Sequence, residues 1–469
     1  MKKLLLLKFL ILFSLISSAQ CLETLTFGGM HTLGQKSDGT LWGWGAAAYG
    51  NLETITIVEP NPIQVGTETD WDVVKAGKLN TFAIKDGTLW GAGSNQYGSL
   101  GVNSATQQFH SFQQVGTATN WMDVYPNSDF TLAIKTDGTL WAWGRNDYNQ
   151  MGNSPNTADQ LFPIQIGSDT DWVSAAGFHR TSFALKSNGT IWGWGSNISS
   201  VIEASSSTNL VLEPTQIGTT TDWVKMSIGL QHVLAQKSDG TLWSWGGGAG
   251  LGVGGSPTET NTPQQISTDK WSWFSAGGNT SYAIKEDGTL WVWGINSFGR
   301  LGDGTDINRF VPYQIGTENN WETVNAGFAN AIMATKSDGT IWYWGGRNQY
   351  GEYGNGESFG ATFILSPVMT DGICVDLTEL GLDGNEKVDE IFSVFPNPAK
   401  DIITVQYELS SSDAELEIYD ISGRSIINQS LRNYEGETKI NTSRFHSGVY
   451  VIVFKRSNGG VWQQKIVIE

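Results

Sequence analysis

One pattern of apolar and polar residues returns seven times along the chain. Its first copy, residues 38–45, reads Asp-Gly-Thr-Leu-Trp-Gly-Trp-Gly, and the central glycines of the seven copies are spaced by 48, 51, 51, 51, 48 and 51 residues. Alternate residues of a strand share a face, so Trp42 and Trp44 point to one side and Leu41 to the other. A fixed period near 50 residues predicts a repeat architecture.

The unit at residues 71–120 shows what one repeat contains. Residues 71–77 and 80–85 are predicted strands, and Asp86-Gly87 predicts a type I′ hairpin, because both turn positions need positive φ. A third strand begins at Thr88, and a fourth covers residues 112–116 after a variable loop. Four short strands repeated seven times predict an all-β fold with a seven-bladed β-propeller.

The paired tryptophans of the motif admit two interpretations. They are core residues if large indoles interleave with small residues such as Gly43, Gly193 and Ala142 where blades pack. They are sugar-stacking platforms if their flat faces are exposed. Their regular recurrence favours the core interpretation, because a binding site is not usually repeated in every blade.

Composition and charge narrow the class of function. Of 469 residues 57 are Gly and only 16% are charged, which suits short strands and tight turns. The formal net charge of −18 repels phosphate backbones, so we expect no nucleic-acid partner. No apolar run reaches the length of about 20 residues that a membrane span needs.

The first 20 residues have the order of a secretory signal peptide: Lys2-Lys3, an apolar run, then small residues up to Ala19. Cleavage near Ala19 would leave Cys21 at or beside the mature N-terminus. A lipoprotein interpretation of Cys21 is disfavoured by Gln20, since a small residue is expected there. We therefore predict an exported protein.

The repeat resembles the regulator of chromosome condensation repeat family. The recurring Asp-Gly-Thr-Leu-Trp-x-Trp-Gly string and the Leu-Gly-x-Gly-Thr segment at 301–305 carry the resemblance, over about residues 22–374. It implies a seven-bladed propeller. Ala92 replaces the second Trp in one unit, Pro126-Asn127 replaces an Ala-Gly pair in another, and residues 196–213 lack the Leu-Gly-x-Gly segment. The name-giving member is a nuclear exchange factor for a small GTPase, an activity that the predicted export argues against here.

The two ends of the propeller segment align with different parts of one unit. Residues 22–28 align with a first strand and residues 367–369 with a last strand, so we expect one blade to be completed by both ends. Cys21 and Cys374 then occupy neighbouring positions in the circular repeat. Because exported proteins meet an oxidising environment, we predict a Cys21–Cys374 disulfide, the alternative being two unrelated thiols.

The chain carries no recognisable catalytic, cofactor or metal constellation. His31 and His232 align, but other units have Asn80 or Thr181 at that place, which are poor metal ligands. The remaining histidines are scattered: His110, His179 and His446. The pair at residues 303 and 306, both Asp, lacks the spacing of a calcium loop. We predict no metal and no cofactor, and consider an enzyme less well supported than a binding protein.

The seven units serve as an internal comparison. Their frameworks repeat, whereas one segment of each unit diverges, between the third and fourth strands: 46–61, 94–111, 145–162, 196–213, 247–262, 295–311 and 346–366. Divergent loops on a rigid scaffold are where recognition usually takes place. The alternative is neutral drift in loops that need only be polar.

The pattern changes after residue 374. Residues 375–391 are an acidic segment without the repeat and are predicted to be a linker. Residues 392–469 alternate like short strands and predict a small β-sandwich. The Phe-Pro-Asn-Pro-Ala opening at 395–399, the Ile-Tyr-Asp and Gly-Arg centre at 418–424 and the Ser-Gly-Val-Tyr strand at 447–450 resemble the type A sorting domain of the type IX secretion system of Bacteroidetes.

This resemblance implies that the signal peptide carries the protein across the inner membrane and that the tail interacts with type IX secretion machinery at the outer membrane. The predicted organisation is thus a signal peptide (1–20), a propeller (21–374), a linker (375–391) and a sorting domain (392–469). We expect a secreted or cell-surface module whose loops bind an unidentified protein or glycan. The alternatives are an extracellular enzyme acting on polysaccharide and a purely structural surface protein.

Overall fold

The chain divides into two compact units, Met1–Leu380 and Gly381–Glu469. The computed structural model describes residues 22–127, 129–153, 156–198, 200–202, 209–255, 259–327, 331–346, 348–358 and 363–374 of the first unit. In the second it describes residues 392–395, 399–400, 402–408, 414–420, 425–431, 435–442, 445, 448–456 and 461–468. The predicted signal peptide, the predicted linker and Cys21 lie outside the described residues.

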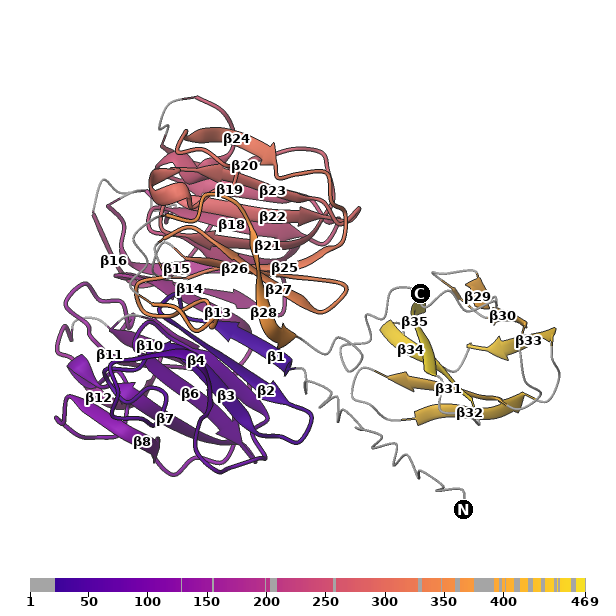
Figure 1. The fold of residues 1–469 in the computed structure, drawn as a ribbon, viewed down its shortest axis with the longest axis horizontal. Coiled ribbons are helices and arrows are strands. Elements are labelled where there is room, and N and C mark those ends of the chain that lie inside the picture. The colour runs from indigo at the N-terminus through magenta and orange to yellow at the C-terminus, as the bar shows by residue number, and fades with distance from the viewer. Residues whose placement is uncertain are drawn as a thin grey trace, which may run out of the picture. The chain divides into compact units, whose positions relative to one another are not determined.

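Seven antiparallel sheets of four consecutive strands make up the first unit, and we number them as blades 1–7 (Figure 1). Blade 1 contains β1 (Leu22–Phe27), β2 (His31–Lys36), β3 (Leu41–Ala46) and β4 (Val58–Gln64). Blade 2 contains β5 (Val73–Ala76), β6 (Asn80–Lys85), β7 (Thr88–Ser94) and β8 (Gln108–Gln114). Blade 3 contains β9 (Trp121–Pro126), β10 (Phe130–Lys135), β11 (Leu140–Gly144) and β12 (Gln160–Gln165). Blade 4 contains β13 (Trp172–Phe178), β14 (Thr181–Lys186), β15 (Ile191–Ser196) and β16 (Leu210–Gln216).

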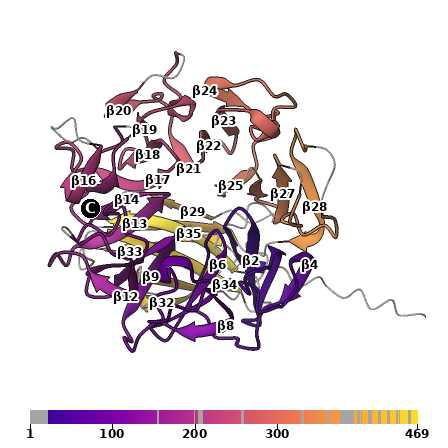
Figure 2. The same ribbon diagram turned by 90° about the vertical axis from the view of Figure 1, so that its left-hand side faces the viewer.

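Blades 5 to 7 repeat this order. Blade 5 contains β17 (Trp223–Ile228), β18 (His232–Lys237), β19 (Leu242–Gly246) and β20 (Thr260–Gln265). Blade 6 contains β21 (Trp271–Gly277), β22 (Thr280–Lys285), β23 (Leu290–Gly294) and β24 (Arg309–Gln314), and blade 7 contains β25 (Trp321–Ala326), β26 (Ile332–Lys336), β27 (Thr340–Trp344) and β28 (Val368–Cys374). Three short 3-10 turns lie in loops: η1 (Gln96–Gly98), η2 (Ala249–Leu251) and η3 (Ser297–Gly299). In Figure 2, β9, β17 and β25 lie nearer the centre of the ring than β12, β20 and β28. The predicted propeller is therefore confirmed.

Two kinds of turn join the second and third strands. In blade 2, Asp86 and Gly87 both have positive φ (49° and 71°), as the type I′ prediction required. In the other blades this turn has one more residue, and only its glycine has a positive φ, as at Gly39 (φ 78°). In that longer turn the Asp38 carboxylate accepts hydrogen bonds from the Thr40 backbone N–H (2.9 Å) and hydroxyl.

The second tryptophan of the motif is the main contact between blades. Trp44, Trp143, Trp194, Trp245, Trp293 and Trp344 are fully buried, which confirms the core interpretation for this position. In each, the indole N–H donates to a loop carbonyl of the preceding blade, as from Trp143 to Ser99 (2.9 Å) and from Trp194 to Gln150 (2.8 Å). The first tryptophan of the motif, such as Trp42, is only partly buried.

The prediction that both ends share one blade is wrong. β1 pairs within blade 1 and β28 within blade 7, so every blade is built from consecutive strands. The ring closes through the contact that joins the other blades, because the Trp44 indole donates to the Glu352 carbonyl of blade 7 (3.1 Å). Leu22 and Trp44 also pack against Met333 and Ile341. Packing and hydrogen bonds, not strand exchange, close the ring.

The second unit contains two antiparallel sheets. The first has the order β29 (Phe392–Phe395), β30 (Ile402–Glu408), β33 (Glu435–Asn441), and the second has the order β32 (Ser425–Leu431), β31 (Ala414–Asp420), β34 (Gly448–Arg456), β35 (Val461–Ile468). Ile403 and Val405 of one sheet share an apolar cluster with Leu416, Ile418 and Ile452 of the other. The sandwich arrangement itself stays a prediction.

We predict that Trp44→Phe loosens the ring at its closing junction. The change removes the N–H donor to Glu352 and should cost about 1–3 kcal/mol of unfolding free energy, since a buried carbonyl loses its short hydrogen bond. Hydrogen exchange followed by mass spectrometry should become faster in blades 1 and 7. Trp245→Phe is the matched control, because its indole also donates to a loop carbonyl, that of Val201 (2.7 Å), while blades 4 and 5 are joined by the chain as well. Equal local exchange in both variants would contradict the prediction.

We also predict an acid-sensitive core. Burial lowers the pKa of His31 to about 3 and of His232 to about 4, from an ordinary value of 6.5. Below pH 6.5 the unfolded chain takes up protons at both sites while the folded chain does not. Stability should therefore fall as the pH drops from 6.5 to about 4, by roughly 1.4 kcal/mol per pH unit for each histidine.

Chemical denaturation of His232→Asn across this range measures the effect. Asn80 occupies the equivalent place in blade 2, so the substitution is compatible with the fold. The variant should lose less stability per pH unit than the parent protein. His110→Asn, at an exposed histidine, should keep the parent's slope, and an equal change in both variants would contradict the prediction.

Candidate functional site

The seven variable segments lie at one end of the propeller. Consecutive strands of each blade run in opposite directions, so the turns between strands one and two and the loops between strands three and four lie on the same side. Backbone hydrogen bonds join the two sets, as from Ala46 N–H to the Met30 carbonyl (2.7 Å) and from Arg145 N–H to the Asp129 carbonyl (2.9 Å). We call this side of the ring the loop face.

A buried asparagine holds the base of the loop in five blades. The Asn95 side-chain oxygen accepts from Leu100 N–H (2.9 Å), and its amide donates to the carbonyls of Ser104 (3.0 Å) and Thr106 (2.8 Å). The same bond to the residue five positions on recurs at Asn146, Asn197, Asn296 and Asn348. Each asparagine follows the glycine of the motif by two or three residues, a signal that sequence reasoning overlooked. The loop bases are framework, and the parts beyond them are free to differ.

Exposed apolar side chains are concentrated in the variable segments. Of the nineteen large hydrophobic residues that are exposed within the described ranges, eleven lie in these segments: Tyr49, Ile55, Ile57, Phe162, Ile198, Leu212, Val253, Phe298, Ile307, Val311 and Leu365. Ile55 is 90% exposed and Ile57 is 71% exposed, both in the loop of blade 1. Burying such side chains against a partner is favourable, by about 25 cal/mol for each Å² of apolar surface.

Some charged side chains of the loop face pair with one another. Arg145 forms ion pairs with Asp129 (3.2 Å) and Asp147 (2.6 Å), and the Arg180 guanidinium lies 4.0 Å from the ring centre of Tyr148. Burial, and then the neighbouring Arg180 charge, lower the pKa of His179. This part of the face therefore presents aromatic and guanidinium groups already held in position.

The residues considered as metal ligands are engaged in the framework. Asp303 accepts hydrogen bonds from Asn296, Thr305 and Arg309, and those bonds lower the pKa of its carboxyl despite burial. His31 and His232 are fully buried. Their side chains bond to Thr81 (3.1 Å) and Ser281 (2.8 Å) of the next blades. In the part of the chain that the structure describes, no three His, Cys, Asp or Glu side chains form a group that could hold a metal ion.

The predicted disulfide is untested. Cys374 ends β28 and its backbone pairs with Thr340 of β27, whereas Cys21 lies outside the described residues. Within those residues, no helix is long and apolar enough to cross a membrane.

Two protein families match the chain. The secretion system C-terminal sorting domain matches residues 393–469, and the regulator of chromosome condensation (RCC1) repeat matches residues 137–185 and 287–328. The sorting domain marks proteins that the type IX system delivers to the cell surface or the outside. The predicted localisation is therefore confirmed.

Curated relatives share the repeats over part of their length. Human E3 ubiquitin-protein ligase HERC2 is 25% identical over 274 residues, which are 56% of this chain and 6% of HERC2. The ultraviolet-B receptor UVR8 of Arabidopsis thaliana is 24% identical over 242 residues, 49% of this chain and 54% of the receptor. The chain thus spans about half of UVR8 and a small part of HERC2.

Solved structures share the fold. Human WBSCR16 superposes with a TM-score of 0.59 at 19% identity, covering 66% of this chain and 85% of WBSCR16. Prp20p of Saccharomyces cerevisiae superposes with a TM-score of 0.58 at 21% identity, covering 65% and 80%. The protein carries regulator of chromosome condensation (RCC1) repeats, folded as a seven-bladed β-propeller, and ends in a type IX secretion sorting domain.

Proposed function

We propose that the exported propeller is a binding module that recognises a protein through its loop face. The observation that carries the proposal is the concentration of exposed apolar side chains in the variable segments, where seven of the eleven lie on loops whose bases are fixed by buried asparagines. Exposed apolar side chains framed by polar groups are typical of protein interaction sites. The fixed loop bases would lower the entropy cost of binding, since little backbone has to be ordered.

Relatives of the same fold support a protein partner. Prp20p is described with binding properties to Gsp1p and histones, and yeast RCC1 has been solved bound to Kap60. Those partners belong to those proteins. We carry over to this chain only the class of partner, a protein. The identity of the partner would depend on the loops, which diverge, and on the exported location.

The proposal predicts that the exposed apolar residues of the blade 1 loop contribute to binding. Replacing Ile55 and Ile57 together by Ser should weaken capture of a partner from surface extracts at least tenfold, because two exposed apolar contacts are lost. The control replaces Val173 and Val224 by Ser. These residues are 42% and 51% exposed and follow the first tryptophan of blades 4 and 5, at the opposite end of the ring.

Quantitative mass spectrometry of captured proteins distinguishes the alternatives. A partner that the loop variant loses and the control keeps supports the proposal. Equal capture by parent, loop variant and control contradicts it and favours a structural surface protein. Retention and cleavage of polysaccharide, unchanged by the loop variant, would instead favour the extracellular enzyme.

We further propose that Cys21 and Cys374 form a disulfide in the exported protein. An oxidising environment favours the bond, and a loop of about 350 residues gives an entropic stabilisation of at most roughly 5 kcal/mol. Peptide mapping without reduction should recover the two cysteines linked. Cys374→Ser should melt at a lower temperature than the parent without reductant, and at the same temperature as the parent with reductant. Two alkylatable thiols in the purified exported protein would contradict the bond.

A further inference from the structure

A lysine covers the first tryptophan of the motif in six blades. The lysine ends the second strand of the blade, and its ammonium lies over the indole at 3.6 Å for Lys36 and Trp42 and at 3.7 Å for Lys135 and Trp141. The corresponding distances in blades 4 to 7 are 4.9, 4.6, 3.9 and 3.7 Å. Aromatic faces attract cations in this geometry. The place above the first tryptophan is therefore one where this fold repeatedly holds an ammonium group.

Blade 2 lacks this contact. Its lysine, Lys85, pairs with Glu68 (2.8 Å) and Asp70 (2.9 Å), and among the described residues no lysine or arginine lies over the ring of Trp90. The two carboxylates raise the pKa of Lys85, so the ammonium stays charged and paired with them. The face of Trp90 is left without the cation that its counterparts have.

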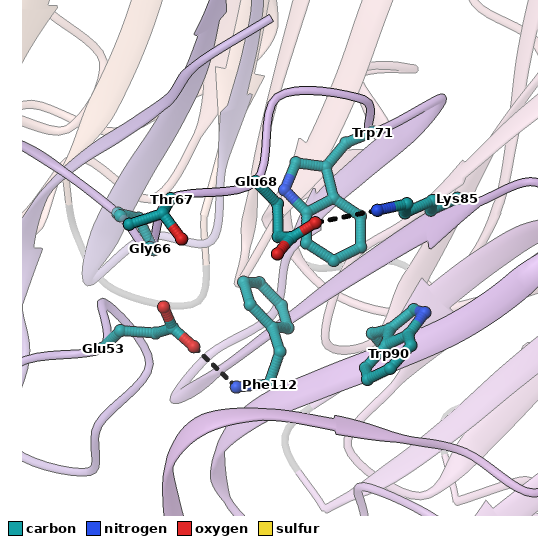
Figure 3. Close-up of a pocket in the computed structure, with 9 residues that line it drawn as sticks. Glu53, Gly66, Thr67, Glu68, Trp71, Lys85, Trp90 and Phe112 are labelled. Carbon is teal, nitrogen blue, oxygen red and sulfur yellow. Dashed lines mark hydrogen bonds and ion pairs between the residues drawn. The ribbon is translucent and has the colours of Figure 1, made fainter.

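A second difference opens space beside Trp90. In five other blades, the tryptophan that begins the blade packs edge-to-face on the first tryptophan of the repeated motif. Their ring centres are 5.8–6.5 Å apart. In blade 2, Phe112 stands where most blades have Pro, and Trp71 packs on Phe112 instead (5.0 Å). A pocket of about 540 Å³ lies here, with Trp71, Trp90 and Phe112 among its walls (Figure 3).

The rim of the pocket is acidic. Glu53 and Glu68 line it together with Lys85, and Asp70 also pairs with that lysine, so the carboxylates in and beside the pocket outnumber its one ammonium. Glu53 is held in place, because one of its oxygens accepts from the Phe112 backbone N–H (2.7 Å). Figure 3 shows Glu53 beside Phe112 and Glu68 reaching across Trp71 to Lys85. Aromatic walls and an excess of carboxylates select a cation over an anion.

We propose that this pocket binds an organic ammonium group, primary or quaternary, over the face of Trp90. The ligand's cation would take the place that a lysine of the chain occupies in the other six blades. The ammonium could come from a choline-like small molecule or from a lysine side chain of another protein. The proposal is independent of the loop-face function, because it rests on different residues.

Ligand-observed NMR titration of the full-length exported protein tests it. Choline and Nα-acetyl-lysine amide are the two cationic probes, and 3,3-dimethylbutanol is the neutral counterpart of choline. We expect at least one cation to bind, and at least tenfold more tightly than the neutral alcohol. Preference for choline assigns the site to quaternary small molecules, and preference for the lysine amide assigns it to protein side chains.

Two variants connect binding with the pocket. Trp90→Ala should weaken binding of the preferred cation at least tenfold, whereas Trp141→Ala in blade 3, where Lys135 already covers the ring, should not. Glu68→Gln with Asp70→Asn keeps every aromatic wall but leaves the Lys85 ammonium without its two carboxylates, and that unpaired charge repels a second cation. This double variant should therefore also weaken binding.

The proposal is overturned by any of three results: no cation binds, the neutral alcohol binds as tightly as the cations, or Trp141→Ala weakens binding as much as Trp90→Ala. Loss of binding of the preferred cation in the double variant, with an unchanged circular dichroism spectrum, separates an effect on the site from unfolding. A failure here would leave the loop-face experiment unaffected, since Ile55 and Ile57 are no part of the pocket.

Discussion

The hydrogen bond from an indole N–H to a loop carbonyl of the preceding blade holds the ring together. It recurs at six of the seven junctions, including the one where the chain is not continuous, from Trp44 to Glu352. The carbonyl is buried, so leaving it without a donor would cost about 1–3 kcal/mol. At the remaining junction Ala92 supplies no indole, and the Asn51 carbonyl accepts only from the Thr81 hydroxyl (2.7 Å), whose counterparts Thr131 and Ser182 donate beside the indole at other junctions. The constraint is thus at least one side-chain donor at each junction, an indole, a hydroxyl or both.

Much of this architecture could be predicted from the sequence because its period is long and strict. The seven copies of the motif and the Asp86-Gly87 turn depend on local residues, whose geometry is decided by neighbours along the chain. Ring closure was predicted wrongly for a physical reason. Alignment of residues 22–28 and 367–369 with parts of one unit shows where the strands belong in the repeat, but not which strands exchange hydrogen bonds.

The candidate sites were predictable to different degrees. The variable segments could be named from their divergence, and the asparagine at their base could have been named from its repeated place after the motif. The pocket of blade 2 could not. Lys85 and Trp90 both match their counterparts in the other blades in sequence. Only the geometry shows that the lysine does not lie over the tryptophan, and the pocket depends on that missing contact.

Blade 2 gathers several departures from the repeat: Ala92 for Trp, Phe112 for Pro and the shorter Asp86-Gly87 turn. Such changes would be costly in a small domain, yet here both neighbouring blades supply framework contacts of their own. Trp71 still packs with Leu52 and Val65 of blade 1, and Leu100 of blade 2 still packs with Trp143 of blade 3. A ring of repeats can therefore relax one blade while its neighbours keep it in place. In blade 2 the lysine does not cover the tryptophan, and an aromatic ring replaces the proline. Together these differences leave room for a cation at a place that a lysine fills in the other blades.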